Sequence, residues 1–299
     1  MKPSPFGYSR PESLDDALST LAAHGSDAKV LAGGQSLLPI LSMRLAAPHH
    51  LVDINRLAEL DYVRVDGAVV RVGALARHAR VLDDVAARVA QPLLGQALRL
   101  VAHATIRNRG TTVGSIVHAD PSGEMTAVLA LLGGSVLVAS MSARREVPAD
   151  EFFLGPLESV VAPGELALEA RFPTLGPRSG TAFVEVSRRH GDYAVCGVGA
   201  LVELDADGAL TSARTAYLSV SPTPLVVDLS EAGADFAAAA ALARERVDPE
   251  PDIHATADYR RHLAGVLTER ALGSAHAAAL DRVQRGSPGS RVSTESRQG

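Results

Sequence analysis

The chain has 299 residues, of which 46% are apolar and 21% are charged, and its formal net charge is −5. This length predicts two or three subdomains, and the mild negative charge argues against a nucleic-acid partner, because such partners require a basic face. The single cysteine, Cys196, excludes an internal disulfide and any iron–sulfur or cysteine-based zinc site built from this chain alone. We therefore expect a reducing, cytoplasmic setting.

The longest apolar run, residues 128–139, is interrupted by Gly133 and Gly134. It is shorter than the roughly 20 residues that a membrane span requires, so no membrane span is predicted. The first five residues carry no apolar segment, so no secretory signal is expected.

Residues 1–55 are expected to form a first subdomain with two strands and two helices. Ser13, followed by Asp16 three residues later, is typical of a capped helix start, and Gly25 ends that helix. The predicted strands lie at 29–32 and 51–54. The second predicted helix, which is short, runs from Leu38 to Leu45 between them.

Residues 56–177 are expected to form a second subdomain. Its predicted elements are a strand at 69–72, helices at 81–89 and 92–102, a loop at 105–115, a strand-like stretch at 115–118, a helix from Asp120 to Gly133 and a strand at 166–172. Asp120 is the candidate N-cap of its helix, because Pro121 suits the first helical position.

Residues 178–285 are expected to form a C-terminal α+β domain. The turn residues from Gly176 to Gly180 mark its boundary. It should contain three antiparallel strands and two helices, at 182–187, 196–204, 210–220, 234–244 and 255–272. Residues 286–299, rich in Gly, Ser and Arg, are predicted to be a disordered tail.

The stretch Ala32-Gly33-Gly34-Gln35-Ser36 lies between a predicted strand and a predicted helix start. A diphosphate needs several converging N–H donors and no obstructing side chain, and glycines permit both the unusual dihedral angles and the close approach. On its own, the stretch is also compatible with a tight turn. A second loop of small residues, 108–115, favours a cofactor held from two sides.

A nicotinamide-binding fold is the alternative, because Asp53 lies 20 residues after Gly33, at the spacing of a ribose-binding acid. The pattern G-x-G-x-x-G is absent, however, and the strand–helix–strand unit is short. We therefore interpret Asp53 as a strand-end residue.

Several separated stretches carry a family resemblance. They are, in order, 29–39, 48–60, 106–111, Gly114-Ser115, 118–121, 182–186, 188–194 and 259–263. From about Lys2 to Leu272 the chain resembles the FAD-binding medium subunit of molybdenum hydroxylases, of the carbon monoxide dehydrogenase medium-subunit type.

The resemblance implies an α+β fold in which two subdomains of the vanillyl-alcohol-oxidase-like (PCMH) type hold FAD non-covalently between them. A C-terminal domain with a three-stranded antiparallel sheet and helices follows. The two loops would hold the diphosphate, Asp120 would lie near the adenosine, and Tyr193 and the backbone near Leu166 would contact the isoalloxazine. The implied cofactor-binding residues are Ala32, Gly33, Gly34, Gln35, Ser36, Leu37, Thr111, Thr112, Val113, Gly114, Ser115, Asp120, Leu166 and Tyr193.

Val113 departs from the family, which usually has glycine at this position. Valine is poorly suited to a positive φ. Either the position has ordinary dihedral angles in this chain, or the second loop is reshaped.

The implied function is electron transfer. A large partner subunit would carry a molybdenum–pterin centre and a small partner two [2Fe-2S] clusters, in a dimer of heterotrimers. FAD would take electrons from these clusters and pass them to a terminal acceptor. Two alternatives remain: an autonomous FAD-dependent oxidase or dehydrogenase, for which no substrate base can be nominated, and a non-catalytic assembly module, which only Val113 favours.

Overall fold

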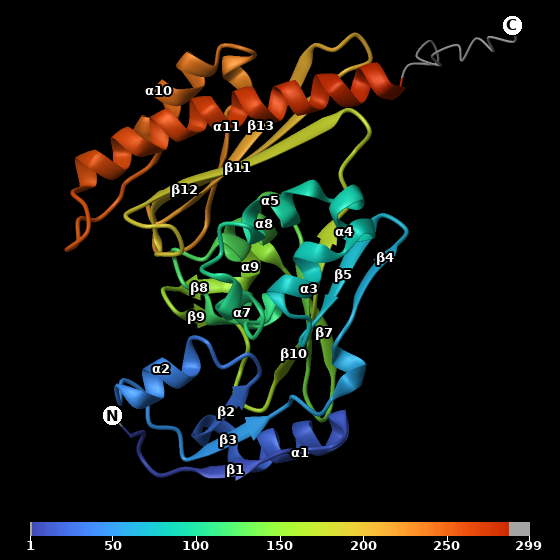
Figure 1. The fold of residues 1–299 in the computed structure, drawn as a ribbon, viewed down its shortest axis with the longest axis vertical. Helices are drawn as coiled ribbons and strands as arrows, with labels where there is room; N and C mark the ends of the chain where they lie inside the picture. The colour runs from blue at the N-terminus through green and yellow to red at the C-terminus, as the bar shows by residue number, and fades with distance from the viewer. Residues whose placement is uncertain (1, 287–299) are drawn as a thin grey trace, which may run out of the picture.

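The computed structural model describes residues 2–286, and Figure 1 shows them as three layers stacked along the long axis, each organised by one sheet. We refer to the N-terminal, middle and C-terminal sheets. The expected disordered tail lies outside the described residues, apart from Gly286, which ends the last helix.

The N-terminal sheet is parallel and has the order β1-β3-β2. Its strands are β1 (Gly7–Ser9), β2 (Ala28–Leu31) and β3 (His50–Asp53), and its helices are α1 (Leu14–His24) and α2 (Leu37–Ser42). The predicted cap is confirmed, because the Ser13 side chain accepts from the N–H of Asp16 at 3.1 Å. Gly25 ends α1 with a positive φ of 51°, also as predicted.

The middle sheet is antiparallel and has the order β4-β5-β10-β6-β7. Its strands are β4 (Val63–Asp66), β5 (Val69–Gly73), β6 (Ser135–Ala139), β7 (Arg144–Pro148) and β10 (Leu166–Pro173). The helices are α3 (His78–Asp83), α4 (Val85–Ala90), α5 (Pro92–Leu98), α6 (Ala104–Arg107), α7 (Thr112–His118), α8 (Glu124–Leu131) and α9 (Ala149–Phe152), and a small hairpin joins β8 (Phe153–Gly155) to β9 (Glu158–Ser159).

Three predictions for this region were wrong in detail. The helix expected at 81–89 is divided at Asp84, whose carboxylate accepts from Ala87 N–H at 2.8 Å and caps α4. The loop expected at 105–115 contains α6 and the first residues of α7. The strand-like stretch at 115–118 is the end of α7, in which Val113 and Ile116 are buried at helical spacing.

Asp120 is not the N-cap of α8, because Gly123 occupies that position. Instead, Asp120 Oδ1 accepts from the N–H of Ser122 at 2.8 Å. Such an Asp-centred turn satisfies the carboxylate before the helix begins. The helix therefore starts three residues later than the Asp-Pro signal predicts.

The C-terminal sheet is antiparallel and contains β11 (Ser179–Ser187), β12 (Ala194–Leu204), β13 (Leu210–Leu218) and β14 (Leu225–Asp228). The three expected strands are present, and β14 is a fourth. It was not predicted because it has only four residues and follows Pro222 and Pro224, which disfavour a strand. The helices α10 (Phe236–Arg246) and α11 (Ala257–Gly286) cover one face, and α11 extends beyond the predicted end at Leu272.

The two faces of the C-terminal sheet belong to different cores. Tyr217 and Val198 pack with α10 and α11 in one apolar cluster. Phe183 and Leu201 point to the other side and join the large cluster that also fills the middle sheet and the N-terminal sheet. Because side chains alternate between the two faces of a strand, one face of the C-terminal sheet packs against the helices α10 and α11 and the other packs against the core of the middle sheet.

Candidate functional site

The first glycine loop joins β2 to α2. Within residues 2–286, the backbone N–H groups of residues 33–37 have no hydrogen-bond acceptor. Gly34 has a φ of +73°, a conformation that favours glycine. The Gly34 carbonyl accepts from Leu38 N–H at 3.0 Å and starts α2. The loop therefore presents a run of free N–H donors and no obstructing side chain at its two glycines.

The second loop lies directly against the first. A Cβ placed on Gly33 would lie 2.5 Å from the carbonyl oxygen of Arg109 and 3.0 Å from the nitrogen of Thr111. Both atoms belong to the backbone, so neither can rotate away. Gly33 is therefore required because the second loop passes over it, and the structure brings the two predicted loops together.

The second loop is the capped start of α7. Thr111 is the N-cap, and its Oγ1 accepts from the N–H of Gly114 at 3.2 Å. A Cβ on Gly114 would lie only 2.5 Å from this Oγ1. Two further bonds tie the loop to the segment before α3: His78 N–H to the Gly110 carbonyl at 2.9 Å, and Thr112 N–H to the Ala76 carbonyl at 3.2 Å.

Val113 lies in α7 with a negative, helical φ, and its side chain is buried. The sequence left two alternatives open for Val113, ordinary dihedral angles or a reshaped loop. The structure shows ordinary dihedral angles. The side chain points into the core, and the Val113 N–H has no acceptor among the described residues. Valine here does not obstruct the loop.

The buried side chain of His78 packs against the second loop. This role was not predicted from the sequence. Its Nδ1 lies 3.2 Å from Thr112 Oγ1, and its ring lies beneath Gly110. Burial, with a smaller contribution from the charge of Arg107, lowers the pKa of His78 to about 4. The ring is therefore neutral at physiological pH.

Asn55 and Arg77 connect the two loops and were also missed. Asn55 Nδ2 donates to the Ala32 carbonyl at 2.9 Å, and Arg77 donates to Asn55 Oδ1 and to the Arg109 carbonyl, both at 2.6 Å. Asp53 ends β3, as interpreted from the sequence. Although burial opposes it, hydrogen bonds from Tyr8 and Asn55 hold the Asp53 pKa below its usual value.

The remaining predicted site residues lie away from the two loops, in the middle and C-terminal sheets and the segments between their strands and helices. Leu166 is buried at the start of β10 and is paired with Ala139 of β6. Tyr193 follows the turn between β11 and β12 and is 68% exposed. Desolvation and the nearby carboxylates of Asp120 and Glu124 raise the Tyr193 pKa. Tyr193 therefore lies within electrostatic range of Asp120, although the two are 73 positions apart in the sequence.

The His103 ring packs against the turn that precedes Tyr193. Gly191 in this turn has a φ of +86°, and a Cβ there would lie 2.5 Å from the His103 ring. The rings of His103 and His190 meet edge to face, with centroids 5.8 Å apart. The positive φ favours glycine at position 191, and a larger residue would also displace the His103 ring.

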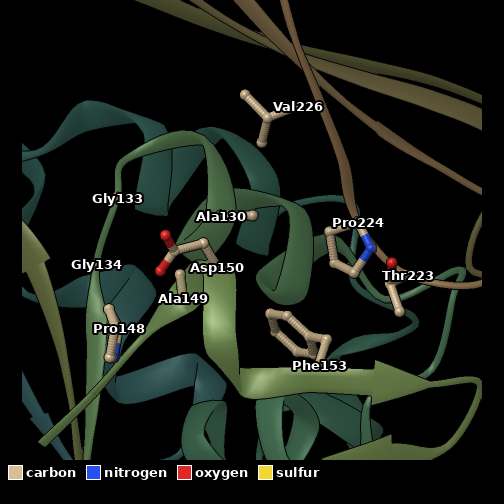
Figure 2. A pocket seen from close by; sticks show the side chains of 10 residues that line it. All are labelled: Ala130, Gly133, Gly134, Pro148, Ala149, Asp150, Phe153, Thr223, Pro224 and Val226. Carbon is tan, nitrogen blue, oxygen red and sulfur yellow. The ribbon is translucent and has the colours of Figure 1, made fainter.

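A pocket of about 590 Å³ lies away from the loops, between α8, α9 and the segment before β14 (Figure 2). Apolar residues and glycines dominate its lining, and Asp150 is the one carboxylate in it. None of the predicted site residues lines this pocket. We assign it no role in cofactor binding.

Two general features bear on function. Within residues 2–286, no group of three or more metal-ligating side chains is placed to hold a metal ion. No helix among these residues is long and apolar enough to cross a membrane.

Two protein families match the chain. Residues 4–175 match the FAD binding domain in molybdopterin dehydrogenase, and residues 181–275 match the CO dehydrogenase flavoprotein C-terminal domain.

Curated relatives cover nearly the whole chain. The 6-hydroxypseudooxynicotine dehydrogenase complex subunit alpha of Paenarthrobacter nicotinovorans is 39% identical over 283 residues, which are 92% of this chain and 96% of the relative. Caffeine dehydrogenase subunit beta of Pseudomonas sp. (strain CBB1) is 39% identical over 292 residues, 95% of this chain and 97% of the relative. The carbon monoxide dehydrogenase medium chain of Hydrogenophaga pseudoflava is 34% identical over 288 residues, 93% of this chain and 99% of the relative.

Solved structures of related proteins also match nearly the whole chain. Carbon monoxide dehydrogenase from Hydrogenophaga pseudoflava contains a chain that is 35% identical with a TM-score of 0.88, over 93% of this chain and 99% of that one. Quinoline 2-oxidoreductase from Pseudomonas putida 86 contains one that is 34% identical with a TM-score of 0.88, over 94% and 100%. The fold expected from the sequence is thereby confirmed.

Proposed function

The chain belongs to the family of FAD-binding proteins of molybdopterin dehydrogenases, and we propose that its two glycine-containing loops hold the diphosphate of FAD. The observation that carries this proposal is the contact between the loops at Gly33, with N–H groups on both loops that have no acceptor among residues 2–286. Hydrogen bonds to a charged group contribute about 1.5–3 kcal/mol each. Four or five of them contribute about 6 to 15 kcal/mol, a range that includes the roughly 8 kcal/mol of a micromolar complex.

The chain is an FAD-binding oxidoreductase subunit that serves electron transfer. The chemistry that FAD supplies when bound is the passage of electrons from [2Fe-2S] clusters of a partner subunit to a terminal acceptor. The described residues bind and orient the cofactor. We propose that residues 32–37 and 111–115 hold its diphosphate without a covalent bond, that Asp120 lies near the adenosine, and that Leu166 and Tyr193 lie near the ring.

We propose that the sheets mark the domains. The first FAD-binding subdomain would comprise residues 1–55, the second 56–177 and the C-terminal domain 178–285. The positions of the sheets support these limits, because the chain leaves the N-terminal sheet after Asp53 and the middle sheet after Pro173.

We propose that the partners are a large molybdopterin subunit and a small [2Fe-2S] subunit, in a dimer of heterotrimers in the cytoplasm. Two of the relatives are a medium chain and a subunit of a dehydrogenase complex. An exposed apolar patch supports a protein partner beside α2: Leu38, Met43 and Leu45 are 45%, 49% and 74% exposed. The substrate belongs to the large partner.

The test is uptake of FAD by the purified, FAD-free chain. We expect quenching of flavin fluorescence and a yellow protein after gel filtration. A colourless chain would contradict FAD binding and favour the assembly module. Co-expression with neighbouring genes for the two partners should then yield one complex with both flavin and iron–sulfur absorbance, whereas turnover of a small substrate by the chain alone would favour an autonomous oxidase.

A further inference from the structure

The guanidinium of Arg77 lies where the two loops meet. One terminal nitrogen donates to the Arg109 carbonyl in the second loop at 2.6 Å, and the other donates to Asn55 Oδ1 at 2.6 Å. The Arg77 backbone is also paired with Thr111 as an isolated antiparallel bridge. The planar, forked guanidinium is suited to two such bonds at once, and a lysine ammonium has no equivalent geometry.

Asn55 extends this link to the first loop. Its side-chain nitrogen donates to the Ala32 carbonyl at 2.9 Å and to Asp53 Oδ1 at 2.6 Å, which fixes the orientation of the amide. The Asn55 oxygen is thereby left to accept from Arg77. A continuous chain of hydrogen bonds thus runs from the first loop through Asn55 and Arg77 to the second.

Among the described residues, no carboxylate is in direct contact with the Arg77 guanidinium. Within residues 2–286, neither Arg77 nor Arg109 forms an ion pair. Burial, followed by repulsion from Arg109, lowers the Arg77 pKa, and attraction from the more distant carboxylates of Asp61 and Asp53 opposes this shift. A half-buried cation held by two neutral oxygens, beside a second cation, favours an anionic ligand at the adjoining loops.

We propose that Arg77 is a positioning residue that fixes the first loop on the second, so that both loops present their N–H groups to one diphosphate. This inference rests on the proposed function. The forked guanidinium is the required feature, because it donates to Asn55 on the side of the first loop and to the Arg109 carbonyl in the second loop. The positive charge adds to the attraction for the diphosphate.

The test compares Arg77→Met and Arg77→Lys with the parent, using the full, FAD-free chain and FAD as the probe. We expect the Kd for FAD to rise about a hundredfold in Arg77→Met, since two hydrogen bonds and a charge are lost. Arg77→Lys keeps the charge but loses the fork, so we expect a rise of about tenfold. Arg80→Met is the matched control on α3, because Arg80 pairs with Asp61 at 2.7 Å outside the loops, and its Kd should stay within about twofold.

A double-mutant cycle separates positioning from a general loss of structure. Asn55→Ala and Arg77→Met interrupt the same chain of bonds, so their effects should not add. We expect the Kd of the double variant for FAD to lie within about threefold of the Kd of whichever single variant binds FAD less tightly. Independent, multiplicative losses would overturn the proposal. So would parent affinity in Arg77→Lys, which would show that the fork is not needed, or in Arg77→Met.

The unfolding midpoint of each FAD-free variant is measured alongside. If Arg77→Met does not fold, Arg77→Lys and Asn55→Ala carry the test, because each leaves one side of the link intact. A parent chain that fails to take up FAD would instead contradict the proposed function, and the two failures are therefore distinguishable.

Discussion

The two loops that meet at Gly33 are built by different means. The second loop is the start of a helix, with a side-chain cap, two backbone bonds to the segment before α3, and a buried row from Gly110 to Val113. The first loop has free N–H groups and few bonds of its own, and only Gly33 within it is buried. We call the second loop the rigid loop and the first loop the free loop. The position of the free loop therefore depends on its contact with the rigid loop. A change at their contact should disturb the cofactor more than a change in either loop alone.

Gly33→Ala should have the largest effect. The added methyl would overlap the Arg109 carbonyl and the Gly110 Cα, at 2.5 and 2.8 Å, and both are backbone atoms of the rigid loop. The loops must separate, so we expect a loss of stability of about 3 kcal/mol and at least about a hundredfold rise in the Kd for FAD. Urea unfolding and fluorescence titration measure the two effects. Normal FAD binding by Gly33→Ala would show that the loops need not touch.

Val113→Gly restores the residue usual in the family and tests the rigid loop. The Val113 side chain is buried, so its removal loses apolar contacts and places glycine in a helix, at a cost of about 3 kcal/mol. The backbone N–H groups remain, so the folded fraction should keep its affinity for FAD within about threefold. Tighter FAD binding by this variant would indicate that valine does obstruct the loop.

His78 makes the rigid loop sensitive to acid. Its pKa is lowered to about 4 in the folded chain, against about 6.5 when unfolded, so the unfolded state binds more protons between these values. Stability from this residue is complete above pH 6.5 and is lost as the pH falls towards 4, by on the order of 3 kcal/mol.

The comparison with His78→Asn isolates this term, because other groups titrate equally in both chains. The parent's free energy of unfolding relative to the variant should fall by on the order of 3 kcal/mol between pH 7 and pH 4. Urea unfolding over this range measures it. A constant difference would mean that His78 is protonated or accessible in the folded chain.

Local signals in the sequence predicted the free loop better than the rigid one. The strand, the glycine pair and the start of α2 follow from neighbouring residues, as does the cap at Ser13. The start of α7 looked like a loop because it lacks a long periodic pattern. Its helical form is stabilised by Thr111 and by the burial of Val113 and Ile116, which depends on distant parts of the chain.

The links between the loops could not be predicted locally. Arg77 contacts residues 22 and 32 positions away in the sequence, and no motif marks it or Asn55. Likewise, Tyr193 comes within electrostatic range of Asp120 only because the C-terminal sheet packs against the middle sheet. The family resemblance assigned Asp120 and Tyr193 to the cofactor site, and the structure gives the side-chain bonds of Asn55 and Arg77.

Gly34→Ala should have the smallest effect, although Gly34 adjoins Gly33 and has the more unusual backbone. Its φ of +73° costs an alanine about 1 kcal/mol, and the added methyl would meet only the flexible ends of Leu38 and Leu31, at 3.1 and 3.2 Å. Gly67→Ala is the matched control, since Gly67 has a φ of +57° and open space around it. We expect the two variants to lose similar stability and Gly34→Ala to bind FAD within about fivefold of the parent. If Gly34→Ala loses FAD as completely as Gly33→Ala, the conformation of the free loop, and not its contact with the rigid loop, governs binding.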